Sequence, residues 1–264
     1  MSPNRSSAVM QQRSEPHNSL DDFPTPPWAT RALCERLQNP CDELLGGKAP
    51  AWTTAAMLCR EPAANRGHMA RPLSEYFASV DASDIYDYGA GFPVRDYLFG
   101  PAPNMVDWTI TNPPFSLAEQ FIHRALETSR YGVAVIVRSA FLESVGRYNS
   151  LFKVNPPSLV LQFTERVVIH KGKLSERGST ATAYCWLVWV KGETGTRFDW
   201  LPPCRKQLDS PNLLEPACSS DDFNDLVNVK TMKLSLHLIV NSKCQGVMKW
   251  LVFQKVILHR SCHC

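Results

Sequence analysis

The residues best suited to chemistry form the string Asn112-Pro113-Pro114-Phe115, directly after the apolar run 106–111. Proline lacks an N–H and has a fixed φ, so two prolines hold the chain extended with their carbonyl groups projecting outward. The asparagine amide adds a further acceptor, and the phenylalanine ring adds a stacking face. The string therefore suits a planar group that bears an NH2, although Asn and Pro also favour plain strand-ending turns.

Three other strings resemble functional motifs, but we expect none of them to form a functional site. Residues 155–158 repeat Asn-Pro-Pro but lack the aromatic residue and follow no predicted strand, so we expect a loop. The fragment Gly89–Gly91 lacks the third glycine of a nucleotide-binding pattern and is expected to be a turn. Two thiols and a histidine at Cys262–Cys264 need ligands from elsewhere to hold zinc, so we expect no metal site.

The elements that must position the first string alternate along the chain. Apolar runs typical of strands lie at 80–89, 106–111, 131–141, 158–170 and 179–192. Residues 116–130 are amphipathic, with Leu117, Phe121, Ile122 and Ala125 on one face, and Thr30 is expected to cap a helix ending near Leu37. This alternation predicts an α/β fold with a mostly parallel sheet and helices on both faces. Such sheets bind ligands beyond the carboxyl ends of their strands.

Charge restricts any nucleic-acid contact to a local patch. The 264 residues carry 28 Lys and Arg against 25 Asp and Glu, which excludes a strongly basic protein. Residues 161–206 hold eight basic and four acidic side chains, and their loop with Lys171, Lys173 and Arg177 is predicted to contact phosphates, against a solvated surface loop as the alternative. Asp81 is expected to be a surface charge.

Composition also bounds the class of protein and its organisation. The nine cysteines are odd in number and no secretory leader precedes them, so we expect reduced thiols, mostly in the core, in a cytoplasmic protein. The sequence contains no run of about 18 apolar residues, so we expect no membrane span. Residues 1–20 are expected to form a disordered tail, 21–206 one domain, and 207–264 a C-terminal segment without assignable chemistry.

With these motifs the sequence resembles S-adenosylmethionine-dependent DNA adenine-N6 methyltransferases of the phage and prophage type. The string at 112–115 matches the family's Asp/Asn-Pro-Pro-Tyr/Phe motif in full. Further matches follow in the family's order across residues 20–206: Thr25-Pro26-Pro27, Glu61-Pro62-Ala63 through Gly67, Asp84-Ile85 and Asp96-Tyr97-Leu98. The resemblance implies a Rossmann-like methyltransferase fold that uses S-adenosylmethionine and methylates N6 of adenine in DNA.

The resemblance also implies roles for the matched residues. It assigns cofactor binding to nine of them, Thr25, Pro26, Glu61, Pro62, Ala63, Gly67, Asp84, Ile85 and Asp96. Among these, Asp84 is expected to bind the ribose hydroxyls, and Asp96 lies in the segment expected to contact the cofactor adenine. The implied catalytic residues are Asn112, Pro113, Pro114 and Phe115. The Asn112 side-chain oxygen and the Pro113 carbonyl would accept hydrogen bonds from the two N6 protons, and Phe115 would stack on a base flipped out of the duplex.

The sequence departs from the family at one position in the cofactor loop. The family usually has two glycines there, whereas this chain has Asn65 and Gly67. Asparagine tolerates positive φ, so the turn is expected to survive, but its side chain is expected to crowd the methionine moiety and weaken cofactor binding. The alternatives are methylation of guanine N2 in RNA or of glutamine in protein, and a non-catalytic nucleic-acid-binding protein with the same fold.

Overall fold

Runs of β-branched and aromatic residues form the strands, because such side chains pack well on a pleated surface. The computed structural model describes residues 21–38, 54–174 and 180–209. Within them, seven strands form one sheet in the order β2-β1-β3-β4-β8-β5-β9, with β6 and β7 in a separate hairpin. The bounds are β1 Leu58–Glu61, β2 Ser79–Ala82, β3 Val106–Thr111, β4 Ser129–Arg138, β5 Leu159–Phe163, β6 Ile169–His170, β7 Lys173–Leu174, β8 Tyr184–Val190 and β9 Arg197–Leu201.

The sheet is mostly parallel, as predicted. Strands β2, β1, β3 and β4 run parallel to one another. Strand β8 runs antiparallel to both β4 and β5, whereas β5 and β9 pair in parallel. The chain leaves β1 for β2 on one side and later returns to β3 on the other side. The strand order thus reverses between β1 and β3, the position where open α/β sheets bind ligands.

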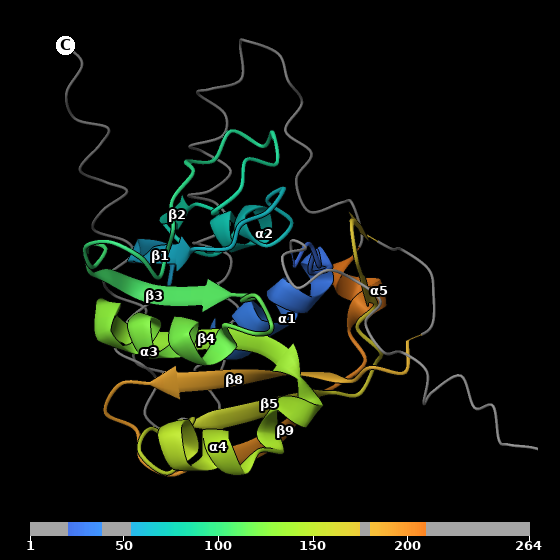
Figure 1. Ribbon diagram of the computed structural model, residues 1–264. Coiled ribbons are helices and arrows are strands. Elements are labelled where there is room, and N and C mark those ends of the chain that lie inside the picture. The colour runs from blue at the N-terminus through green and yellow to red at the C-terminus, as the bar shows by residue number, and fades with distance from the viewer. Residues whose placement is uncertain (1–20, 39–53, 175–179, 210–264) are drawn as a thin grey trace, which may run out of the picture. The chain divides into compact units, whose positions relative to one another are not determined.

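Helices cover both faces of the sheet, which confirms the predicted layers (Figure 1). On one face α1 and α2 enclose a core that includes Trp28 and Trp108. On the other face α3 and η4 contribute Ile122 and Leu151, which pack with Leu187 of β8. The bounds are α1 Pro27–Gln38, η2 Thr54–Ala56, α2 Ala70–Ser74, α3 Ala118–Thr128, η3 Ser139–Leu142, α4 Val145–Arg147, η4 Tyr148–Phe152 and α5 Arg205–Leu208.

Three local predictions are wrong. Helix α1 begins at Pro27, since proline suits the first helical turn, so Thr30 lies buried inside the helix instead of capping it. Helix α3 begins at Ala118, and Leu117, which was expected on the apolar face, is 40% exposed. The run 158–170 is not one strand, because β5 ends at Phe163 and β6 begins only at Ile169.

The chain divides into two units, residues 1–210 and 211–264, and all the described residues lie in the first. The boundaries predicted at residues 20 and 206 stay predictions. No helix among the described residues is long and apolar enough to cross a membrane. The cysteines described there are free thiols, and three of the four are buried as predicted: Cys34, Cys59 and Cys185, with Cys204 half-buried.

Candidate active site

A cavity of about 190 Å³ opens at the carboxyl ends of β1 and β3, where the strand order reverses. Because the strands there are parallel, their carboxyl ends bring together segments that are far apart in the sequence. Nine of the thirteen predicted catalytic and cofactor residues line this cavity: Thr25, Glu61, Pro62, Ala63, Asp84, Ile85, Asp96, Asn112 and Pro114. The remaining four, Pro26, Gly67, Pro113 and Phe115, belong to the same segments but are not among its lining residues.

Asn112 directly follows β3 and presents an unpaired acceptor. Its Nδ2 donates to the carbonyl oxygen of Phe23 at 2.8 Å and to Oγ1 of Thr25 at 3.0 Å. Since a carbonyl oxygen can only accept, these contacts fix which way the amide points. Its Oδ1 is buried and has no hydrogen-bond partner among the described residues. The predicted catalytic asparagine is therefore held in place with one acceptor left for a donor.

Phe115 lies between the N-terminal segment and the end of β4. Its backbone N–H donates to Oδ2 of Asp21 at 2.9 Å, and its ring centroid lies 5.0 Å from that of Phe23. The guanidinium of Arg138 lies 4.3 Å from the Phe115 ring centroid, in a cation–π contact. The predicted stacking residue thus already contacts a planar cation.

Glu61 ends β1 as a fully buried carboxyl group. Its Oε1 accepts hydrogen bonds from Oγ1 of Thr111 at 2.6 Å and from the N–H of Ala63 at 3.0 Å. Its Oε2 has no partner among the described residues. Burial raises the pKa of Glu61 to about 8, although both hydrogen bonds favour the charged form. The cavity wall therefore holds an acid that a cationic ligand group would ionise.

The cofactor-loop turn forms as predicted, with Asn65 at φ +50°. The N–H of Asn65 donates to Oδ2 of Asp84 at 2.9 Å, and the N–H of Tyr86 donates to Oδ1 of Asp84 at 3.0 Å. Burial raises the pKa of Asp84, and these backbone donors oppose the shift. Gly67, at φ +83°, has no room for a side chain, since a Cβ there would lie 2.9 Å from the Phe92 ring. The hydrogen bond between Asn65 and Asp84 thus joins the loop after β1 to the segment after β2 at the cavity.

The loop that carries Asp96 is fixed by its own turn and by an arginine from α3. Oδ1 of Asp96 accepts from the N–H groups of Leu98 and Phe99 at 2.9 and 3.0 Å. Arg124 donates to the carbonyl oxygens of Leu98, at 3.2 Å, and of Pro101, at 2.8 Å. The segment predicted to contact the cofactor adenine is thus held against the cavity.

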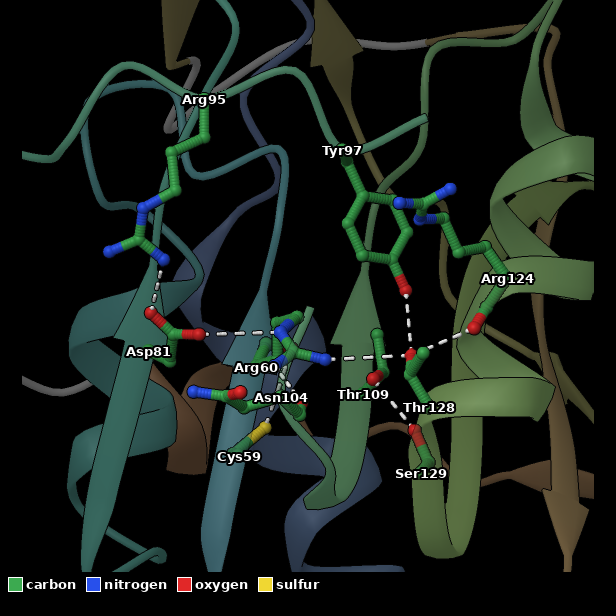
Figure 2. A network of polar contacts seen from close by, with 10 residues as sticks. All are labelled: Cys59, Arg60, Asp81, Arg95, Tyr97, Asn104, Thr109, Arg124, Thr128 and Ser129. Atoms are coloured by element: carbon green, nitrogen blue, oxygen red, sulfur yellow. Dashed lines mark hydrogen bonds and ion pairs between the residues drawn. The ribbon is translucent and has the colours of Figure 1, made fainter. Parts of the chain in front are cut away.

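A buried arginine supports this loop from below (Figure 2). Arg60 of β1 is 3% exposed, pairs with Asp81 of β2 at 3.3 Å and donates to the carbonyl oxygen of Asn104. Asp81, which is 28% exposed, also pairs with Arg95 at 2.9 Å, so this charge near the surface has an arginine on each side. Charged side chains are buried only when paired, so Arg60 needs these partners, and they bind it to the loop. The network therefore ties residues 95–104 to the sheet.

The predicted phosphate contacts lie on the β6–β7 hairpin. Lys171 and Lys173 are exposed there, and Arg177 lies outside the described residues. The N–H of Gly172, between the two lysines, donates to the carbonyl oxygen of Asp22 at 2.8 Å. Among the described residues no cluster of His, Cys, Asp and Glu could hold a metal ion, and Cys262–Cys264 lie outside them.

Sequence reasoning missed three of the residues that surround the catalytic string. Asp21 and Phe23 precede the recognised Thr-Pro-Pro segment, and their contacts span about ninety residues of chain. Arg138 had a usable signal, because it ends the strand adjacent to β3, and the carboxyl ends of neighbouring parallel strands meet at one edge.

Comparison with known proteins identifies the fold. No protein-family model matches the sequence, and a comparison with curated proteins finds no match. A solved structure described as a class I S-adenosylmethionine-dependent methyltransferase from Listeria monocytogenes is 12% identical, with 70% of this chain and 68% of that chain covered at a TM-score of 0.51. The methyltransferase subunit of a type I restriction-modification system from Streptococcus thermophilus is 10% identical, with 67% and 47% covered at a TM-score of 0.50. The chain therefore has the Rossmann-like fold of the class I methyltransferases.

Proposed function

We propose that the protein transfers a methyl group from S-adenosylmethionine to the exocyclic N6 amine of adenine in DNA. The observation that carries this proposal is the Oδ1 atom of Asn112, which is buried, unpaired among the described residues, and held at the cavity close to Phe115. An NH2 group on a planar ring offers a donor for this oxygen and a face for the aromatic side chain.

The cavity residues fit S-adenosylmethionine. The unpaired Oε2 of Glu61 suits the cationic amino group of the methionine moiety, which would draw the carboxyl into its charged form. Asp84 would bind the ribose hydroxyls, and the loop at Asp96 would contact the adenine. When bound, S-adenosylmethionine supplies an electrophilic methyl group.

The residues of this chain would act on the target amine by positioning and hydrogen bonding. An adenine N6 is a weak nucleophile, because its lone pair is delocalised into the ring. Hydrogen bonds from its two N–H groups to Asn112 Oδ1 and to the Pro113 carbonyl would favour a pyramidal nitrogen with a localised lone pair. The fixed Asn112 amide needs no reorganisation to make its bond, which is the condition for efficient electrostatic stabilisation.

DNA as the substrate is supported by two observations. The restriction-modification subunit that shares the fold is a methyltransferase of a DNA-modifying system. The hairpin presents Lys171 and Lys173, side chains suited to phosphate contacts. Since N6 is paired inside a duplex, the base must leave the stack to reach the cavity, and Phe115 would then stack on it.

The test is methyl transfer from labelled S-adenosylmethionine to duplex DNA, followed by nucleoside digestion and mass spectrometry. We expect N6-methyladenine. Label in guanine of RNA or in glutamine of protein, with none in DNA, would refute the substrate but keep the reaction. Absence of S-adenosylmethionine binding would refute the enzyme and favour a non-catalytic nucleic-acid-binding protein.

A further inference from the structure

Asp22 holds the cofactor loop through its carboxylate. Its Oδ1 accepts from Nδ2 of Asn65 at 2.7 Å and from Nη1 of Arg66 at 2.9 Å, and its Oδ2 accepts from Nη2 of Arg66 at 3.0 Å. The carboxylate is 13% exposed, so these charge-assisted bonds are only partly screened by water. Burial opposes ionisation, but the hydrogen bonds from Arg66 and Asn65 leave the pKa of Asp22 below its ordinary value.

The same residue holds the basic hairpin through its backbone. The carbonyl oxygen of Asp22 accepts the N–H of Gly172 at 2.8 Å. Oδ2 of Asp22 also lies 3.9 Å from the position that a Cβ on Gly172 would occupy. Gly172 has φ +73° and forms the turn between Lys171 and Lys173. A displacement of Asp22 would therefore move the turn that presents both lysines.

Asn65 gains a role from this arrangement. Its amide Nδ2 is bonded to Asp22, and its Oδ1 accepts the N–H of Arg66 at 2.6 Å. Both polar ends of the Asn65 side chain are therefore hydrogen-bonded, one to Asp22 and the other to Arg66. The expectation from sequence was that this side chain crowds the methionine moiety. In the structure this side chain ties the N-terminal segment to the cofactor loop, and the crowding stays a prediction.

We propose that Asp22 is a positioning residue that couples the cofactor cavity to the basic hairpin, so that cofactor and nucleic acid each strengthen the binding of the other. A ligand in the cavity orders the cofactor loop, which holds the Asp22 carboxylate. A polyanion bound to Lys171 and Lys173 orders the turn that the Asp22 carbonyl oxygen holds. Each ligand then removes motion that the other would otherwise have to restrict. The coupling rests on the proposed function, and by thermodynamic linkage it is equal in both directions.

The experiment measures the dissociation constant of S-adenosylhomocysteine with and without a saturating duplex DNA, and that of the DNA with and without S-adenosylhomocysteine. This ligand carries no transferable methyl group, so no turnover occurs. We expect the wild-type protein to show the same ratio in both directions, about tenfold. Asp22→Ala should bring the ratio close to one. Asn65→Gly, which keeps a residue that tolerates φ +50°, should lower the ratio as well.

The control is Glu75→Ala, which removes the ion pair between Glu75 and Arg31 at 2.7 Å, between α1 and the residue after α2. This variant should keep the wild-type ratio, and thermal melting should show that all variants fold. If both ligands bind the wild-type protein but the ratio of dissociation constants is one, the coupling is refuted and the proposed function is not. The same holds if Asp22→Ala keeps the wild-type ratio. Tighter S-adenosylhomocysteine binding by Asn65→Gly with an unchanged ratio would overturn the role of Asn65. No S-adenosylhomocysteine binding by the wild type would overturn the proposed function and the coupling with it.

Discussion

Asn112→Ala removes the acceptor on which the proposed chemistry depends. One preorganised hydrogen bond made in the transition state is worth about 3 kcal/mol, so we expect kcat to fall by about 10²–10³-fold. Apart from Thr25 and Pro26, the proposed cofactor residues lie at the end of β1, after β2 and in the loop at Asp96, so the dissociation constant of S-adenosylhomocysteine should change by less than about threefold, or about 0.65 kcal/mol. The assay is methyl transfer to DNA under single-turnover conditions, with binding measured by calorimetry.

The same substitution has a structural cost that the design must separate from catalysis. It leaves the Phe23 carbonyl and the Thr25 hydroxyl without the Asn112 donor, and each lost partner costs about 1 kcal/mol. A lower melting temperature is therefore expected and does not count against the reasoning. Activity should be compared at a temperature where the variant is fully folded.

The chain offers a matched control in its second Asn-Pro-Pro string. Asn155 is exposed, and its hydrogen bonds, with the Trp189 indole and the Leu151 carbonyl oxygen, use backbone groups that alanine keeps. Asn155→Ala should leave kcat unchanged. If folded Asn112→Ala retains activity within tenfold of wild type, the acceptor is not used in the transition state and the assignment of Asn112 is wrong.

Three further predictions concern stability. Because burial raises the pKa of Glu61 from its ordinary 4.5 to about 8, the folded protein keeps a proton that the unfolded chain releases. Stability should thus fall as pH rises from about 5 to 8, and urea titrations of Glu61→Gln should lack that decline; the same slope in both proteins would refute the buried acid. Asp81→Ala leaves buried Arg60 without its carboxylate and should cost about 3 kcal/mol, whereas Arg95→Ala, at a pair whose arginine is 52% exposed, should cost less than about 1 kcal/mol. Equal losses in melting experiments would contradict this ranking. Gly132→Ala would place a Cβ 2.4 Å from a buried indole ring and should destabilise by more than about 1 kcal/mol, and a neutral result would show that the ring can move.

The sequence was most informative where a residue type restricts its own backbone. Two prolines after an apolar strand predicted the end of β3, and Asn65 adopts the positive φ that its side chain tolerates. Strand and helix periodicity predicted the layers, because burial on one or both faces leaves a repeat in the residues themselves. The candidate site followed from these local features together with the family resemblance.

Local sequence patterns could not predict contacts between segments that are far apart in the chain. Thr30 was misread as a cap because Pro27 already starts the helix and Thr30 then turns into the core. The pairing of Asp81 could not be predicted, because nothing near it in sequence shows that Arg60, on the neighbouring strand, is buried and needs a partner. The antiparallel direction of β8 likewise depends on a connection that periodicity does not describe.

Three buried polar atoms at the carboxyl ends of β1, β3 and β4 have no hydrogen-bond partner among the described residues. Oε2 of Glu61 and Oδ1 of Asn112 lie at the ends of adjacent strands, and Nε of Arg138, beside Phe115, is a third buried atom without a hydrogen-bond partner among the described residues. Each such atom costs about 1–3 kcal/mol in a folded protein, and a ligand that paired with these three would offset that cost. Asn112 Oδ1 is an acceptor, and Glu61 Oε2 becomes one when a cationic ligand group ionises the carboxyl, so amine donors would satisfy both. Arg138 Nε is a donor that an anionic group would satisfy. A cationic methionine moiety, an aromatic amine and a phosphate together match these three unpaired atoms.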